Sequence, residues 1–236
     1  MIELKNVSLS YNKEYYALYN INLSIQKGEC VAVVGLSGSG KSSLLRLIAG
    51  LDKPVQGEIL IDKVPIEEVD FISQVSVGFL SSKPVFFENK SVYNNLAWAL
   101  KIRKIDKQSW ETKIDDALNE FNILELKNKK VNKLTKTEKK LVQIARLMLR
   151  PLDILLCDDI GINPEEENFE VLSDAFKKLV KKDKKHKAVV FVCNNFNLFQ
   201  DIATRKIKLV SGSVEEDIGV SGEWNLSRKT NRRNYF

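Results

Sequence analysis

The stretch that decides the fold is Gly35-Leu36-Ser37-Gly38-Ser39-Gly40-Lys41-Ser42, which matches the pattern G-x-x-x-x-G-K-[ST]. The apolar run CVAVV (30–34) precedes it directly, and the amphipathic run SLLRLIAG (43–50) follows it. A strand, a glycine-rich turn and a helix in that order aim successive backbone N–H groups into one cavity, next to the positive end of the helix. Both flanks disfavour an incidental glycine-rich turn. The stretch therefore predicts a binding site for the phosphates of a nucleoside triphosphate.

Two side chains of this stretch and one distant carboxylate have separate expected roles. Lys41 is expected to contact the β- and γ-phosphate oxygens, and the Ser42 hydroxyl is expected to ligate Mg²⁺. A carboxylate is needed across the cavity, and Asp158 follows the apolar run ILLC (154–157). Parallel sheets bind ligands at the carboxyl ends of their strands. We therefore expect Ser42 and Asp158 to hold the metal; the alternative role of Asp158 is to cap a following helix.

Composition excludes several classes of function. The 236 residues are 44% hydrophobic and 29% charged, which is enough apolar material for a folded core. The net charge is +6, and the single histidine, His186, excludes chemistry that needs a histidine pair or a histidine-rich metal site. Cys30, Cys157 and Cys193 each lie in a short apolar run, which predicts buried reduced thiols and a reducing compartment rather than disulfides.

The chain also lacks the pattern of a membrane-spanning or secreted protein. No apolar stretch approaches the roughly 18 to 20 residues that cross a bilayer, and MIELKNV (1–7) has the pattern of a strand rather than of a signal peptide. We expect a cytoplasmic protein that reaches a membrane only through a partner.

Hydrophobic periodicity divides the chain into three parts. The first part predicts short strands around the phosphate loop, including 57–62 and 75–80. From Ser91 to about Lys133 the period is helical, as in a helical insertion. The last part alternates helix and strand (helices 135–150 and 165–182, strands 153–157 and 188–193), as a parallel sheet requires. The strand pattern ends after 207–210 at Ser211-Gly212, and a polar tail follows.

Over nearly its whole length the sequence resembles the nucleotide-binding subunit of ATP-binding-cassette (ABC) transporters. The resemblance rests on the order of the phosphate loop, Gly57-Glu58-Ile59, the segment 82–104, and LTKTEKKLVQIARLMLRPLDILLCDD (134–159). It implies an α/β fold with a P-loop NTPase core, an N-terminal antiparallel β-subdomain and a helical insertion. The implied division is an ATP-binding core (1–87 and 151–220), a helical signature subdomain (88–150) and a basic tail (221–236).

The resemblance also implies a set of ATP-binding residues. Tyr11 falls at the position that stacks on adenine in the family, although an exposed tyrosine on an edge strand is the alternative. The remaining positions implied to bind ATP are Gly35, Ser37, Gly38, Ser39, Gly40, Lys41, Ser42 and Ser43. The implied cofactors are ATP and Mg²⁺.

The family signature Leu-Ser-Gly-Gly-Gln/Glu is altered in this chain. It is replaced here by Leu134-Thr135-Lys136-Thr137-Glu138. In the family the two glycines allow close approach to the ATP held by the opposite subunit, and Lys136 and Thr137 put side chains into that approach. Lys136 can alternatively reach a phosphate as a charge. Thr135 and Glu138 retain the spacing of a capping box at a helix start.

Three further positions depart from the family pattern. The catalytic glutamate after Asp158 is Asp159, one methylene shorter, and a misplacement of about 1 Å can cost on the order of 100-fold in rate. The lid-loop glutamine falls at Ser82. The switch histidine falls at Asn194, whose amide hydrogen-bonds but carries no proton. Together these changes predict tight Mg-ATP binding with slow or absent hydrolysis.

The expected function is that of the ATP-binding subunit of an ABC-type membrane complex, of transporter or cell-envelope and division type. Its expected partners are an integral membrane permease and a second nucleotide-binding subunit, in a homodimer or a heterodimer, at the cytoplasmic face of the inner or plasma membrane. The segment 84–87 offers apolar residues for docking, or it belongs to the subdomain core. The alternative function is a non-hydrolysing, nucleotide-gated scaffold. A nucleic-acid partner is disfavoured, because the lysine clusters lack interleaved aromatics, and anionic lipid suits the basic tail better.

Overall fold

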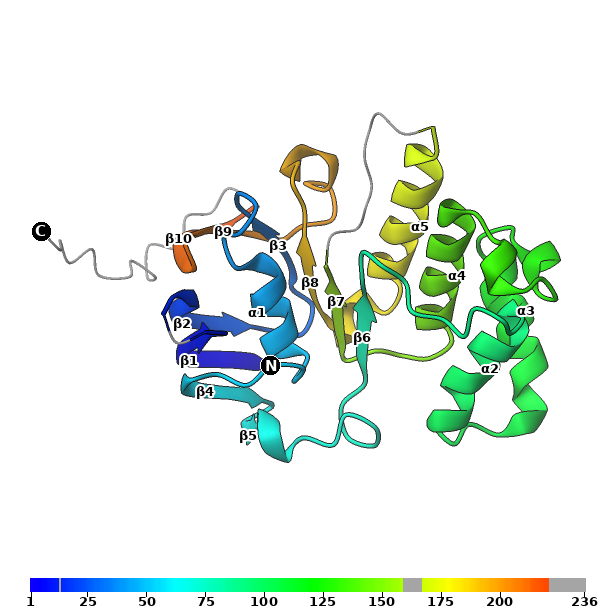
Figure 1. The fold of residues 1–236 in the computed structure, drawn as a ribbon, viewed down its shortest axis with the longest axis horizontal. Coiled ribbons are helices and arrows are strands. Elements are labelled where there is room, and N and C mark those ends of the chain that lie inside the picture. The colour runs from blue at the N-terminus through cyan, green and yellow to red at the C-terminus, as the bar shows by residue number, and fades with distance from the viewer. Residues whose placement is uncertain (13, 159–166, 221–236) are drawn as a thin grey trace, which may run out of the picture.

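The computed structural model describes residues 1–12, 14–158 and 167–220. They form two β-sheets and a group of helices arranged side by side along the long axis of the molecule (Figure 1). The strands are β1 (Ile2–Ser10), β2 (Tyr16–Ile25), β3 (Cys30–Val34), β4 (Gln56–Ile61), β5 (Val64–Pro65), β6 (Val77–Leu80), β7 (Ile154–Cys157), β8 (Ala188–Val192), β9 (Arg205–Val210) and β10 (Ser213–Gly219). The α-helices are α1 (Lys41–Ile48), α2 (Val92–Ile102), α3 (Trp110–Asn119), α4 (Lys136–Met148) and α5 (Phe169–Lys181).

The larger sheet has the strand order β10-β9-β3-β8-β7-β6, in which all neighbours are parallel except the hairpin β9-β10. Strands β3, β7 and β8 are continuous apolar runs, and nearly all of their residues are buried. Such runs are typical of strands that are covered on both faces. This sheet therefore brings the phosphate loop after β3 next to the ends of β7 and β8.

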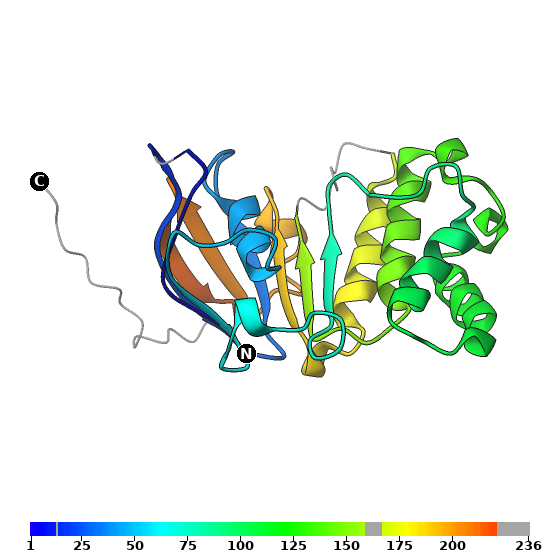
Figure 2. The same cartoon turned by 60° about the horizontal axis from the view of Figure 1, so that its bottom comes forward.

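The smaller sheet is antiparallel and has the order β2-β1-β4-β5. Together with alternate residues of the larger sheet it encloses α1, and their apolar side chains form one hydrophobic cluster. A second cluster lies on the opposite face of the larger sheet and includes residues of α2 to α5. The view in Figure 2 shows these layers, with α1 on one side of the larger sheet and α4 and α5 on the other.

The α/β fold class predicted from the sequence is confirmed, with small shifts at the element ends. The helix expected over 135–150 runs over Lys136–Met148, because Thr135 caps it and Pro151 disfavours helical backbone at Arg150. The strand expected over 75–80 begins at Val77. The start of the helix expected over 165–182 falls partly outside the described residues, and α5 begins at Phe169.

One expectation about the C-terminal part was wrong. The strand pattern was expected to end after Val210, but Ser211 and Gly212 form a turn that leads into β10. Both turn residues have positive φ, 46° and 79°, as in the type I′ turns that join two antiparallel strands. A Ser-Gly pair after an apolar run is a hairpin signal, but the charged residues of β10 hide the strand that follows it.

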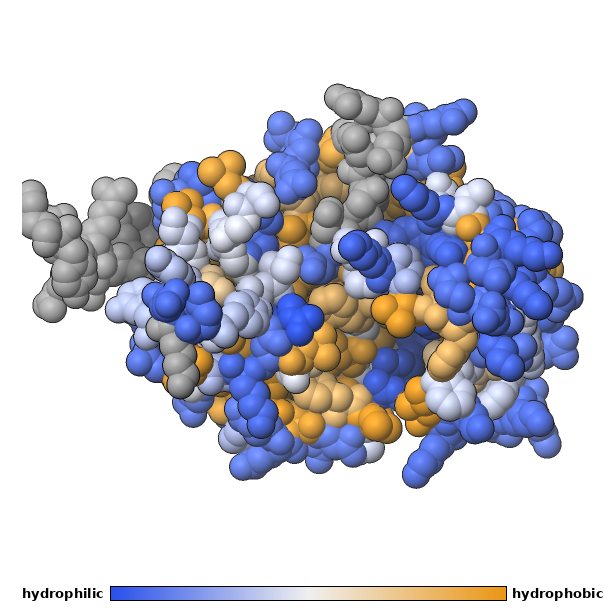
Figure 3. All heavy atoms as spheres, in the orientation of Figure 1, coloured by the Kyte–Doolittle hydropathy of each residue, from blue (hydrophilic) through white to orange (hydrophobic). Residues whose placement is uncertain are grey.

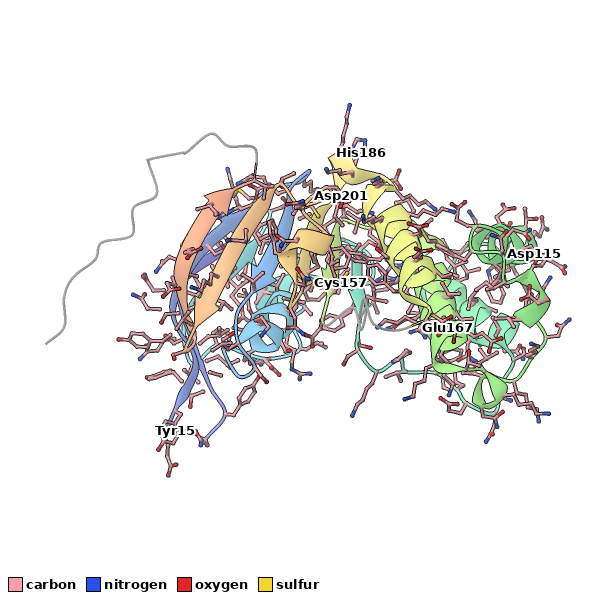
Figure 4. The ribbon with its side chains drawn as sticks, turned by 90° about the horizontal axis from the view of Figure 1, so that it is seen from above. Tyr15, Asp115, Cys157, Glu167, His186 and Asp201 are labelled. Carbon is pink, nitrogen blue, oxygen red and sulfur yellow. The ribbon has the colours of Figure 1, made fainter. Side chains whose placement is uncertain are left out.

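The three cysteines are buried, as their apolar runs predict, and the single histidine is exposed. All three cysteines are buried and free, and burial raises the pKa of the Cys30 and Cys193 thiols to about 12. His186 is exposed just before β8, at the opposite end of that strand from Val192 and Asn194. Figure 4 shows His186 well separated from Tyr15 of the β1–β2 loop. Within the described residues, no helix is both long enough and apolar enough to cross a bilayer.

Candidate functional site

The phosphate loop connects β3 to α1, and its backbone requires glycine at two close approaches. Gly40 has a φ of 98°, and a Cβ atom there would lie 2.5 Å from the Ala17 carbonyl oxygen. Gly35 also has a positive φ, and a Cβ atom there would clash with the Leu209 carbonyl oxygen. Because only glycine fits these positions, the loop can wrap closely against β2 and β9.

The side chains of Lys41 and Ser42 lie at the start of α1 and point to different partners. The Lys41 ammonium donates to the carbonyl oxygens of Gly35 and Leu36, both at 2.8 Å, so it lies along the loop. The Ser42 hydroxyl donates to Asp158 Oδ1 at 2.7 Å, across 116 residues of sequence. The order β3-β8-β7 in the parallel sheet places the end of β7 near the end of β3, which brings Asp158 to the first turn of α1.

A cavity of about 340 Å³ opens above these groups. Its lining residues come from β2, the phosphate loop, α1 and the ends of β7 and β8: Ala17, Ser37, Gly38, Gly40, Lys41, Ser42, Ser43, Asp158, Val192 and Asn194. Gly35 and Ser39 belong to the same loop but are not among the lining residues, and Ser39 is only 5% exposed. Among the described residues, the Ser39 hydroxyl is one of two buried side-chain polar atoms without a hydrogen-bond partner.

The cavity fits ATP with Mg²⁺ on chemical grounds. A serine hydroxyl and a carboxylate, already 2.7 Å apart, are the hard oxygen ligands that Mg²⁺ prefers. The lysine ammonium and the N-terminus of α1 supply the positive charge that a triphosphate needs. Two of the sequence-predicted groups, Lys41 with its loop and the pair Ser42 and Asp158, are thus brought to one cavity.

Tyr11 follows β1 and lies beside α1, outside the cavity lining. Its side chain is exposed, at 63%, but its hydroxyl donates to Asp52 Oδ2 at 2.8 Å and contacts Ser43 Oγ at 3.2 Å. Asp52 in turn pairs with Arg46 of α1. Neither Arg46 nor Asp52 was identified from the sequence, because their link to Tyr11 spans about 40 residues and has no motif.

The other sequence-predicted catalytic positions are dispersed. Asn194 lines the cavity after β8. Ser82 is exposed just beyond β6 and does not belong to the lining; its neighbour Ser81 accepts a 2.9 Å hydrogen bond from buried Lys140 of α4. Asp159 lies outside the described residues. The described part of the chain therefore places one of these three positions at the phosphate cavity.

The residues predicted to form an altered signature lie at the N-terminus of α4 and do not line the phosphate cavity of their own chain. Thr135 Oγ1 accepts from the Glu138 backbone N–H at 3.2 Å, and Glu138 Oε2 accepts from the Thr135 N–H at 2.7 Å. The predicted capping box is confirmed. The Thr135 N–H bond is the main reason why the pKa of Glu138 lies below its ordinary value. Lys136 is exposed and Thr137 is half-buried at the same helix end.

The capping box is expected to contribute to stability. Thr135→Ala should lower the free energy of unfolding by about 1 kcal/mol, because an N–H of the first turn of α4 loses its acceptor. Because the folded pKa of Glu138 is lowered, its share is complete above the ordinary carboxyl pKa and is lost as pH falls through the folded pKa. Urea unfolding at neutral and acidic pH measures both effects. Thr137→Ala, two residues further along in the first turn of α4, is the matched control and should change the free energy of unfolding by less than about 0.5 kcal/mol.

A second cavity, of about 390 Å³, lies between the segment after β6 and helices α2 and α4. It is lined by Val85, Phe86, Phe87, Asn95, Trp98, Ala99, Ile102 and Arg146, and we call it the apolar groove. Figure 3 shows apolar side chains gathered on this face of the molecule, around a hollow. Val85, Phe87 and Trp98 are 77%, 53% and 46% exposed. The segment 84–87 therefore has both of the features expected for it: Phe86 packs against the core, and Val85 and Phe87 on either side of it are exposed to solvent.

Polar contacts hold the groove in shape. Asn95 of α2 is buried and bonds both backbone groups of Phe87: it accepts from the N–H at 2.8 Å and donates to the carbonyl at 3.2 Å. Phe87 meets Trp98 edge-on, with ring centroids 5.6 Å apart. Arg146 lies 4.7 Å from the Phe86 ring and donates to the Val85 carbonyl, and burial lowers its pKa. The groove is thus pre-formed, with an arginine at its base.

Comparison with known proteins identifies the family. Residues 18–160 match the family model described as ABC transporter. An uncharacterized ABC transporter ATP-binding protein of Methanocaldococcus jannaschii, MJ0796, is 32% identical over 94% of this chain and 98% of its own length. The sulfate/thiosulfate import ATP-binding protein CysA of a Synechocystis strain is 31% identical over 94% of the chain. The methionine import ATP-binding protein MetN of Helicobacter pylori is 27% identical over 92%.

The chain spans 61% of the Synechocystis protein and 67% of the Helicobacter protein, but nearly all of MJ0796. The dimeric structure of MJ0796 superimposes with a TM-score of 0.81, at 30% identity, over 94% of this chain and all of that one. A second MJ0796 structure, in a post-hydrolysis state with ADP and Pi, superimposes equally well. Matching sequence, matching fold and a phosphate loop with its carboxylate agree: the chain belongs to the ABC transporter family, as one of its ATP-binding proteins.

Proposed function

We propose that this protein binds Mg-ATP at the phosphate loop and couples nucleotide binding to a separate integral membrane permease, with slow or absent hydrolysis. The observation that carries the proposal is the contact between Ser42 Oγ and Asp158 Oδ1, 2.7 Å apart at the cavity that Lys41 lines. In this assignment Gly35 to Ser43 hold the phosphates, Ser42 and Asp158 hold Mg²⁺, and Tyr11 stacks on adenine. The bound metal would shield phosphate charge.

Weak hydrolysis follows in this proposal from what the cavity lacks. Asn194 lines the cavity at the switch position, and an amide can hydrogen-bond a phosphate oxygen but cannot carry a proton or a positive charge. Ser82 is exposed just beyond β6, and its side chain is shorter than the glutamine of the family at this position. Asp159 retains a carboxylate at a shorter reach. In this proposal the site therefore binds Mg-ATP but hydrolyses it slowly or not at all.

We also propose that the protein acts as a dimer, with itself or with another ABC nucleotide-binding subunit. The dimeric structure of MJ0796 supports this. In the dimer Thr135 to Glu138 would face the partner's ATP, and Lys136 and Thr137 would weaken that contact. The chain is proposed to work as an ATP-binding core (1–87 and 151–220) and a helical subdomain (88–150), at the cytoplasmic face of the membrane.

The apolar groove is the proposed docking site for the permease. Its rim exposes Phe87 and Trp98, while Asn95 and Arg146 fix its floor, so a short apolar cytoplasmic segment of a membrane protein would bury the rim. The names of the import ATP-binding proteins of Helicobacter and Synechocystis agree with a partner of this class. The groove lies in the segment that joins β6 to the helices, which connects it mechanically to the larger sheet.

Phe87→Ser with Trp98→Ser is expected to reduce recovery of an integral membrane partner at least about tenfold, since a few aromatic side chains that become buried on binding commonly dominate the binding energy of an interface. The measurement is co-purification from the native membrane with partners identified by mass. Val171→Ser on α5, at a valine that is 52% exposed, is the matched control and should leave recovery unchanged. Undiminished recovery of the same permease with the double variant would reject the groove as the docking site.

A non-hydrolysing, nucleotide-gated scaffold is the second candidate function. Asn194 in the cavity favours it, because that position cannot support proton transfer. The two functions differ in partner: the scaffold would be recovered in a nucleotide-dependent complex without a permease. The same co-purification, performed with and without Mg-ATP, distinguishes them.

A further inference from the structure

The Tyr11 side chain is anchored at its hydroxyl, although most of its ring is exposed. The hydroxyl donates to Asp52 Oδ2 at 2.8 Å and lies 3.2 Å from Ser43 Oγ, which can donate in return. Ser43 directly follows Ser42 on α1 and lines the phosphate cavity. The ring is thus held at a set position next to the cavity, with an open face.

Asp52 is itself held by Arg46 in a two-pronged ion pair. Arg46 Nε donates to Asp52 Oδ2 and Arg46 Nη2 donates to Oδ1, both at 2.8 Å. The Asp52 side chain is only 13% exposed, and the Arg46 bonds hold the pKa of its carboxyl below the usual range. Arg46 lies one helical turn after Ser43, so both side chains lie on the same face of α1. From that face Ser43 contacts the Tyr11 hydroxyl directly, and Arg46 holds Asp52, which accepts the hydrogen bond from that hydroxyl.

We propose that the Arg46–Asp52 pair positions the Tyr11 ring as a pre-formed platform for a purine base, and so sets the preference of the site for a nucleotide over a bare polyphosphate. This inference rests on the proposed nucleotide binding at the phosphate loop. Stacking on an aromatic ring stabilises a base. A ring that is already ordered loses less rotational freedom on binding, so the anchor increases affinity for the base and leaves the phosphates untouched.

A purely structural role for the ion pair predicts a different result. Arg46 is 46% exposed, and exposed ion pairs contribute little to stability. If the pair only stabilises the C-terminal end of α1, its loss would change the affinity for ATP and the affinity for inorganic tripolyphosphate by the same factor. The informative quantity is therefore the ratio of the affinity for ATP to the affinity for inorganic tripolyphosphate, in which any effect of the Asp52 charge on the phosphates cancels.

The test measures both affinities by calorimetry with Mg²⁺ present. Asp52→Asn and Tyr11→Phe should each reduce the ATP to tripolyphosphate ratio about tenfold, the scale of a hydrogen bond to a charged group. Because both variants remove the same bond, the double variant should lose no more than the larger single loss. Glu58→Gln is the matched control: it breaks the exposed 2.9 Å pair with Lys5 in the smaller sheet and should leave the ratio unchanged.

The outcomes separate this inference from the function on which it rests. If the wild-type protein binds neither ligand, both fail. If it binds ATP and the ratio is the same in Asp52→Asn and Tyr11→Phe as in wild type, only the positioning role is rejected. If Asp52→Asn does not fold, Arg46→Lys provides the same test, since a lysine cannot hold both carboxylate oxygens, and its ratio should fall by a smaller factor.

Discussion

Lys41→Ala is expected to lower the affinity for Mg-ATP by at least about 100-fold, because the ammonium supplies charged hydrogen bonds that each contribute roughly 1.5–3 kcal/mol. In the structure the ammonium lies on the carbonyls of Gly35 and Leu36, so it is free to turn toward a phosphate without moving the backbone. The loop itself keeps its shape in the variant, since Gly35 and Gly40 determine the turn. Calorimetric titration with Mg-ATP measures the loss.

Two comparisons make the Lys41 result specific. Lys53→Ala, at an exposed lysine shortly after α1, removes the same charge and should bind ATP as the wild type does. Ser42→Ala should retain metal-free ATP binding but lose most of the gain that Mg²⁺ brings, because the hydroxyl beside Asp158 is gone. Full ATP affinity in Lys41→Ala would place the nucleotide elsewhere and reject the proposed site.

Restoring the altered positions is expected to produce an active ATPase. A variant with Ser82→Gln, Asp159→Glu, Asn194→His, Lys136→Gly and Thr137→Gly should release phosphate at least about 100-fold faster than the wild type, since positioned acid–base groups contribute typically 10²–10⁴-fold. The physical reason is that, in our proposal, the wild-type site retains the groups that bind Mg-ATP and lacks those that orient the attacking water. The readout is steady-state phosphate release, measured at a protein concentration high enough for the protein to dimerise.

The controls for the restored variant isolate chemistry from binding. Adding Lys41→Ala to it should abolish the gained activity. Asn194→His alone should gain little, because water still lacks a well-placed base. Turnover of the wild type at about 1–10 s⁻¹, typical of enzymes, would contradict weak hydrolysis. A restored variant that dimerises on ATP and still hydrolyses at the wild-type rate would reject our assignment of these positions.

The local elements were predictable because each has a short-range physical cause. The runs CVAVV, ILLC and AVVFV became buried parallel strands, and Thr135 with Glu138 became a capping box. In contrast, β10 was missed, because its pattern of charged residues gains order only by pairing with β9. The groove was predicted in part: its segment 84–87 is apolar in sequence, but Trp98 and Arg146 join it from two helices.

By itself the sequence determined that this protein has a phosphate loop between a strand and a helix and a carboxylate after an apolar strand. These follow from spacing along the chain, which fixes backbone conformation and the order of the elements. The substitutions that we propose at the signature and switch positions come instead from the resemblance of the sequence to the ABC family. Only the tertiary structure decided that Ser42 meets Asp158, that Arg46 and Asp52 hold Tyr11, and that Phe87 and Trp98 share an exposed groove. Such contacts join residues distant in sequence, and their distances exist only once the sheets and helices have packed.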